Sequence, residues 1–172
     1  IVVNSDGSYT FTPLANWNGT VPTVTEEVSD GHQTVTNTLN IVVLPVNDAP
    51  QTQAASAHVV EGTTYTFKST DFTFSDPVEG DAQHRTQSVI MNTLPAGGVM
   101  TLNGTAVTTG QAVSLADIAS GKMQFTPSAS NVGANAGSSF SFSVKDAGGT
   151  TNGGQDQSPA KVFSLLVDQY TE

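Results

Sequence analysis

The heptapeptide GSYTFTP at residues 7–13 recurs in a second version, GKMQFTP, at residues 121–127, 114 positions later. Both versions are followed by a loop of small residues and then by a strand in which apolar and polar residues alternate. That strand ends in VSDG at residues 28–31 in the first copy and in VKDAG at residues 144–148 in the second. A last alternating strand closes each copy. Four features that keep the same order indicate an internal structural repeat.

The two copies differ in length. The second copy is preceded by about 70 residues that have no counterpart before the first copy. We therefore predict a complete repeat at residues 50–172 and only the C-terminal half of a preceding repeat at residues 1–49. The sequence PVNDAP at residues 45–50 joins them, and its prolines favour a short, stiff connector. The missing strands predict unpaired sheet edges in the first unit, explained either by a cut within a repeat or by pairing with another chain.

Composition and alternation predict an all-β fold. The chain has 16 Gly and 8 Pro, which leaves little room for long helices. One helical turn is expected at residues 113–119, with Ser114 as its cap and Gly121 as its stop. Seven short antiparallel strands in one repeat are typical of an immunoglobulin-like β-sandwich. We expect these strands at residues 56–60, 63–70, 87–93, 98–108 (interrupted at 103–104), 122–126, 138–145 and 161–168.

Charge and cysteine content limit the partners. The chain carries 15 Asp+Glu against 5 Lys+Arg, a formal net charge of -10 at pH 7. Such a chain repels nucleic acids and anionic membranes but suits hard cations, which prefer carboxylate and carbonyl oxygens. The absence of cysteine excludes disulfides and thiolate chemistry and favours a bacterial origin. No apolar run approaches a membrane span, and Ile1 opens directly into strand-like sequence, so we expect an interior segment of a longer polypeptide.

Several motifs carry a family resemblance. They are DGSYTFTP (6–13), ANWNG (15–19), VSDG (28–31) and VNDAP (46–50) in the first copy, and FTFSD (72–76), LPAG (94–97), residues 121–127 and DAGG (146–149) in the second. Together they resemble the cadherin-like tandem domains of bacterial RTX adhesins. The resemblance implies an immunoglobulin/cadherin-like β-sandwich, type I secretion and display at the bacterial cell surface. It also implies calcium ions that stiffen the joints between neighbouring repeats, and a role as a non-enzymatic extender in cell adhesion and biofilm formation.

Acidic residues gather where strand order brings three segments together. If the chain enters the complete repeat at one end, the loops at residues 71–84 and 146–160 both lie at that end, beside the connector. We predict a calcium site there, since Ca²⁺ takes about 6–8 oxygen ligands at flexible geometry. The alternative for each of these acidic residues is that it caps its own turn, and we favour this alternative for Asp71. Asp30 is expected to bind no metal. The predicted ligands are Asp48, Asp76, Asp81 and Asp146, followed by Asn47 and Glu79.

The sequence also allows a second function, in which the chain is a module that binds a glycan or peptide through the same two long loops. It would need an exposed aromatic residue there, whereas Phe72 and Phe74 alternate as core residues do. We expect Trp17 to be half-buried and to pack within its own loop. The alternative is that its ring is a surface on which a sugar stacks. An enzyme is not expected, because the three histidines are scattered and no nucleophile motif is present. We expect a monomer whose main partners are neighbouring repeats.

Overall fold

The computed structural model describes residues 1–79, 86–129 and 137–168. It confirms an all-β architecture, consistent with an immunoglobulin/cadherin-like β-sandwich. The chain forms two compact units, Ile1–Val46 and Asn47–Glu172, so Asn47, Asp48 and Ala49 belong with the second unit. Among the described residues no helix is long and apolar enough to cross a membrane.

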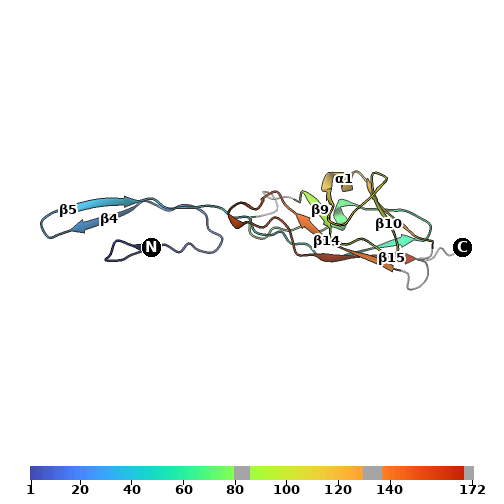
Figure 1. The fold of residues 1–172 in the computed structure, drawn as a ribbon, viewed down its shortest axis with the longest axis horizontal. Helices are drawn as coiled ribbons and strands as arrows, with labels where there is room; N and C mark the ends of the chain where they lie inside the picture. The colour runs from blue at the N-terminus through green and yellow to red at the C-terminus, as the bar shows by residue number, and fades with distance from the viewer. Residues whose placement is uncertain (80–85, 130–136, 169–172) are drawn as a thin grey trace. The chain divides into compact units, whose positions relative to one another are not determined.

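The first unit consists of three strand pairs. β1 (Val2–Val3) pairs with β2 (Tyr9–Thr10), β3 (Gly19–Thr20) with β6 (Val42–Val43), and β4 (Val24–Ser29) with β5 (Thr34–Leu39), all antiparallel. β4 and β5 form the hairpin drawn in blue in Figure 1. All residues of this unit are described, and none of them is buried.

The second unit is a two-sheet sandwich. Its five-stranded sheet has the order β12-β9-β14-β15-β7, and its four-stranded sheet has the order β11-β10-β13-β8. β9, β10, β14 and β15 are labelled in Figure 1 together with the short helix α1. The bounds are β7 (Ala55–Val60), β8 (Tyr65–Thr66), η1 (Ser69–Asp71), β9 (Ser88–Met91), β10 (Gly98–Leu102), β11 (Thr105–Ala106), β12 (Ala112–Ser114), α1 (Leu115–Ala119), β13 (Met123–Pro127), β14 (Gly137–Lys145), η2 (Thr151–Gly153) and β15 (Lys161–Asp168).

Phenylalanine side chains fill the space between the two sheets. Phe140 and Phe163 are register partners on β14 and β15, and their rings stack with centroids 5.2 Å apart. Phe67 and Phe72 pack against Phe163 from the other side of the core, at 5.5 and 5.6 Å. Aromatic pairs of this geometry contribute about 0.5–1.5 kcal/mol each beyond their buried area. This cluster is the centre of a core that the first unit lacks.

Two expectations from alternation were wrong in detail. β7 pairs with β15 in parallel, not antiparallel, because alternation fixes which face a strand buries and not the direction of its neighbour. The strand expected at residues 63–70 is only β8, since η1 follows at once and turns the chain. β12 was not expected as a strand, because its three residues are too few to show a period.

The expected helical turn is confirmed. α1 begins after Ser114, whose hydroxyl accepts a hydrogen bond from the backbone N–H of Asp117 at 3.0 Å. Gly121 follows the helix with φ +74°, a left-handed conformation that ends helices and favours glycine.

Candidate functional site

Asn47 lies in a socket formed by the loop that follows β14. Its side chain is 8% exposed, and its Nδ2 donates to the carbonyl oxygen of Gln155 at 2.6 Å. The same nitrogen donates to both carboxylate oxygens of Asp146, at 3.2 and 3.3 Å. The backbone N–H of Gln155 donates in return to the carbonyl oxygen of Asn47 at 2.8 Å. The start of the second unit is thereby fixed to this loop through both backbone and side chain.

Glycines make room for that socket. A Cβ atom on Gly148 would lie 1.7 Å from Oδ1 of Asn47, and one on Gly154 would lie 3.1 Å from its Cβ. A side chain on Gly148 would therefore displace the amide. The sequence DAGG at residues 146–149 thus combines the acceptor, Asp146, with the space that its donor needs.

The socket loop is itself held at both ends. The backbone N–H of Asp146 donates to the carbonyl oxygen of Asp156 at 3.0 Å, and Lys145 forms an ion pair with the Asp156 carboxylate at 3.1 Å. On the return segment, the hydroxyl of Ser158 accepts from the backbone N–H of Val144 at 3.0 Å. These links keep the carboxylate of Asp146 in place, and that group is 2% exposed.

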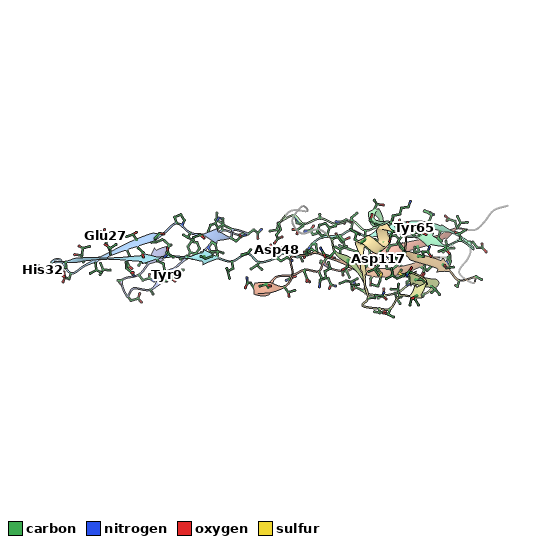
Figure 2. All side chains as sticks on the ribbon, turned by 90° about the horizontal axis from the view of Figure 1, so that it is seen from above. Tyr9, Glu27, His32, Asp48, Tyr65 and Asp117 are labelled. Carbon is green, nitrogen blue, oxygen red and sulfur yellow. The ribbon has the colours of Figure 1, made fainter. Side chains whose placement is uncertain are left out.

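Asp48 connects the chain to the other predicted loop. Its backbone N–H donates to Oε1 of Glu79 at 2.8 Å, and the backbone N–H of Glu79 donates to Oδ1 of Asp76 at 3.1 Å. Asp76 is 3% exposed, whereas the side chain of Asp48 is exposed. Figure 2 shows Asp48 at one end of the second unit. Neighbouring residues of the chain, Asn47 and Asp48, thus engage the two loops that strand order predicted to meet.

The surroundings of Glu79 favour its neutral form. Burial raises the pKa of Glu79 above its ordinary value, and the adjacent carboxylate of Asp76 raises it further. The hydrogen bond from the backbone N–H of Asp48 acts in the opposite direction and lowers this pKa. Glu79 and Asp76 are therefore adjacent acidic side chains, and a single positive charge near them would stabilise the ionised form of both.

The structure does not bring all the predicted ligands to one point. Asp81 lies outside the described residues. Among residues 1–79, 86–129 and 137–168, no group of three or more acidic or histidine side chains is close enough to hold a metal ion. Asn47 with Asp146 forms one half of the site, and Asp76 with Glu79 forms the other, while Asp48 contributes its backbone N–H.

Two further aspartates accept hydrogen bonds within their own turns, a role that was expected for Asp71. Asp71 accepts from the hydroxyl of Tyr65 and from the backbone N–H of Lys68, both at 2.8 Å, and Figure 2 shows Tyr65 well away from Asp48 within the second unit. Asp30 accepts from the backbone N–H groups of His32 and Gln33 at 2.8 and 2.7 Å. Both carboxylates are therefore occupied by their own turns.

The oxygen atoms at the two halves of the site are of the type that calcium prefers as ligands. Oδ1 of Asn47 and Oε2 of Glu79 are buried and have no hydrogen-bond partner among the described residues. Acceptor oxygens in that condition are costly unless positive charge compensates them. Carboxylate and amide oxygens on loops are the ligands that Ca²⁺ prefers, because it tolerates irregular geometry. Asn47 and Asp146 on one side, and Asp76 and Glu79 on the other, are the residues that could contribute ligands to an ion.

The sequence alone did not reveal the contribution of Gln155, Gly148 and Gly154. Gln155 acts through its backbone, which leaves no trace in residue type. The glycines act through the absence of a side chain, and the pairs at residues 148–149 and 153–154 were the available signal.

Features of the alternative functions lie elsewhere. Phe72 is 4% exposed and Phe74 packs against the core, so neither offers an exposed ring at the long loops. His32 lies in the β4–β5 turn, His58 on β7 pairs with Asp168 at 2.8 Å, and His84 is outside the described residues. Trp17, 38% exposed, lines a groove in the first unit. Binding of a glycan or peptide stays a prediction.

Comparison with known proteins finds a similarity over one part of the chain. A family model described as a cadherin-like domain matches residues 1–44. No curated protein and no solved structure matches the sequence. Cadherin-like domains are typically non-enzymatic, extracellular modules of the adhesion type, and the first unit has the sequence features of such a domain.

Proposed function

We propose that this chain is a spacer segment of a large secreted bacterial adhesin, in which calcium at the start of the second unit stiffens the joint between repeats. The cadherin-like match to residues 1–44, the internal repeat and the net charge of -10 support this function. So does the resemblance of the sequence motifs to RTX adhesins, which carries with it type I secretion and a role in cell adhesion and biofilm formation. The partners are neighbouring repeats of the same polypeptide, and the segment is a monomer.

The observation that carries the proposal is the attachment of the chain at Asn47 and Asp48. The first residue is bound to the loop after β14, and the second to the loop that contains Glu79. A segment held by hydrogen bonds from two loops has lost the backbone freedom that makes connectors bend. Pro45 and Pro50 restrict the backbone on either side of it.

When bound, calcium would supply positive charge to the buried carboxylates of Asp76 and Asp146. Asp76 and Asp146 each provide a buried carboxylate, and a nearby cation would oppose the burial that raises the pKa of Glu79. Asn47 contributes an amide that donates to Asp146 through Nδ2 and leaves Oδ1 for a cation. The residues thereby couple the order of the chain start to the concentration of calcium.

Calorimetric titration of the whole chain with calcium chloride tests this function. We expect a dissociation constant on the order of 10⁻⁴–10⁻³ M, the range of extracellular modules. A variant with Asp76→Asn and Asp146→Asn should bind at least about tenfold more weakly, because affinity follows the number of charged ligands. The matched control is Asp117→Asn, since that carboxylate pairs with Lys122 at 2.6 Å. Equal affinities in all three proteins would contradict the assignment.

Small-angle scattering separates binding from stiffening. The maximum dimension and the flexibility of the chain are measured with calcium and after chelation. We expect chelation to increase flexibility in the native chain and to change nothing in the double variant. Calcium that binds without altering the scattering would exclude the stiffening role while leaving the site.

A further inference from the structure

A turn of four residues, 30–33, joins β4 and β5 of the first unit, and the last register pair before it is Ser29 with Thr34. The backbone N–H of Asp30 donates to the carbonyl oxygen of Gln33 at 3.3 Å. In return, Oδ1 of Asp30 accepts from the backbone N–H groups of His32 and Gln33, at 2.8 and 2.7 Å. The turn therefore uses its own aspartate to close itself.

A longer loop joins β14 and β15 of the second unit. Asp146 holds the repeat position of Asp30. Its backbone N–H donates to the carbonyl oxygen of Asp156 at 3.0 Å, which closes the loop as the corresponding hydrogen bond closes the turn of the first unit. The two connections thus match at both ends. Between the matched ends the second unit has nine residues, 147–155, where the first unit has two, 31–32. We call residues 147–155 the socket segment.

The socket segment supplies most of the surroundings of Asn47. The backbone of Gln155 accepts from Nδ2 of Asn47 at 2.6 Å and donates to its carbonyl oxygen at 2.8 Å. Gly148 and Gly154 leave the space for the side chain, since a Cβ on either would lie within 3.1 Å of an Asn47 atom. Of the contacts described above for the socket, only the carboxylate of Asp146 comes from outside the segment.

The first unit has the aspartate of the socket but not the segment. Two residues span at most about 7 Å, which is too short to surround a side chain. Their backbone N–H groups also donate within the turn, that of Gly31 to the hydroxyl of Ser29 at 3.2 Å and that of His32 to Asp30. A turn of this kind therefore offers no counterpart of the Gln155 backbone.

The socket fits an amide and not a carboxylate. Nδ2 of Asn47 donates to three acceptor oxygens, the two of Asp146 and the carbonyl oxygen of Gln155. An aspartate in place of Asn47 would have no hydrogen to donate and would bring a second negative charge to a buried carboxylate. The side chain that the segment selects is thus the asparagine of the connector.

We propose that the socket segment decides whether a repeat holds its own connector. A repeat with this segment fixes the connector asparagine, and a repeat closed by the four-residue turn of the first unit leaves the corresponding residue unheld. Joints of the two kinds then differ in stiffness before any metal binds. The inference deepens the proposed function, and its meaning for a tandem string rests on that function, because both concern the joint between repeats.

A loop exchange tests the proposal. In the shortened variant residues 147–155 are replaced by the Gly-His sequence of residues 31–32, so that Asp146 and Asp156 stay and the second unit acquires the turn of the first. NMR relaxation is measured with a calcium chelator present. We expect the backbone order parameter of Asn47 to fall from about 0.85 to below about 0.6. The side-chain amide hydrogens of Asn47 should exchange with water at least about tenfold faster.

Internal controls report whether the rest of the second unit is intact. The amides of β14 and β15 should remain protected in the shortened variant. The backbone N–H of Gln51 donates to the carbonyl oxygen of Ser75 at 2.7 Å, and its exchange should be unchanged, because this contact lies beyond the connector.

A second variant keeps the length of the loop and fills the socket. Gly154 has φ -59° and ψ 160°, which a larger residue adopts without strain, so Gly154→Leu crowds Asn47 alone. It should release Asn47 as the shortened variant does, and it decides the question if that variant does not fold. Thr150→Leu, at an exposed position of the same segment, is the matched control and should leave Asn47 ordered.

The outcomes separate this inference from the calcium site. An ordered Asn47 in both socket variants, with β14 and β15 folded, would overturn the inference. So would an Asn47 that is already mobile in the native chain without calcium, whatever the calorimetric titration shows. If the titration finds no calcium binding but Asn47 is released in the socket variants only, the proposed calcium function fails and the role of the socket segment stands.

Discussion

The side-chain amide of Asn47 donates to both carboxylate oxygens of Asp146, at 3.2 and 3.3 Å, across a sequence separation of 99 residues. Both residues are buried, so neither group can exchange this partner for bulk water. The contact links the first residue of the second unit to the loop after its longest strand. The order of that loop and the direction in which the chain enters the unit therefore depend on each other.

Replacing Asn47 by alanine tests the strength of this link. The Asn47→Ala variant leaves the buried Asp146 carboxylate and the Gln155 carbonyl oxygen without this donor. We expect a loss of about 1–3 kcal/mol in the free energy of unfolding. Urea denaturation with a calcium chelator present measures it, so that metal binding does not contribute. The exposed Gln53→Ala is the control, and an equal effect of both substitutions would show that the amide contributes little.

The socket also depends on the space at Gly148. We expect Gly148→Ala to displace the Asn47 side chain, because the added Cβ would meet Oδ1 at 1.7 Å. Crowding of this kind costs about 1–3 kcal/mol. Gly149→Ala is the comparison, since its φ of +76° strains an alanine although no atom lies within 4 Å of the new Cβ. NMR of the side-chain amide of Asn47 distinguishes them: only Gly148→Ala should shift its resonances.

The pKa of Glu79 predicts a pH dependence of stability. Because burial raises this pKa, the folded chain binds more protons than the unfolded chain over the interval between the two pKa values. The contribution of Glu79 is therefore fully present below the ordinary glutamate pKa and is lost as the pH rises through the raised one. We expect Glu79→Gln to remove this loss, because the amide stays neutral and its oxygen can still accept from Asp48.

Denaturation at a series of pH values from 4 to 8, without calcium, measures this effect as the difference between the native chain and the variant. The native chain should lose stability relative to the variant toward higher pH. Adding calcium at pH 7 should reverse the order if Glu79 binds the ion. A difference that does not vary with pH would show that Glu79 ionises as it does in the unfolded chain.

The aromatic core predicts the most damaging substitution in the second unit. Phe163 is fully buried and contacts the rings of Phe67, Phe72, Phe140 and Phe142. We expect Phe163→Ala to cost about 3–5 kcal/mol, the usual range for a buried phenylalanine. Val162→Ala, at a 49% exposed neighbouring position, should change stability by less than about 0.5 kcal/mol. Calorimetric unfolding of both variants measures the difference.

The sequence predicted the fold better than it predicted the site. Alternation and turn residues located most strands of the second unit, since a period of two and a glycine or proline boundary are visible in residue types. The parallel pairing of β7 with β15 left no such signal. Strand order correctly suggested that residues 47–48 meet both long loops, but Asn47, ranked below the aspartates, makes more contacts there than Asp48 does. The partners of Asn47 include backbone groups of Gln155, which no residue pattern encodes.

The pairing of β7 with β15 has a mechanical consequence. Because these neighbours run in parallel, the chain enters the second unit at one end of the sheet and leaves it at the opposite end. Tension applied through the two termini of this unit pulls the adjacent strands along their length in opposite directions. The six register pairs then carry the load in shear and must break together, whereas an antiparallel hairpin pulled from its open end unzips one pair at a time. The second unit is thus built to resist stretching along its own length.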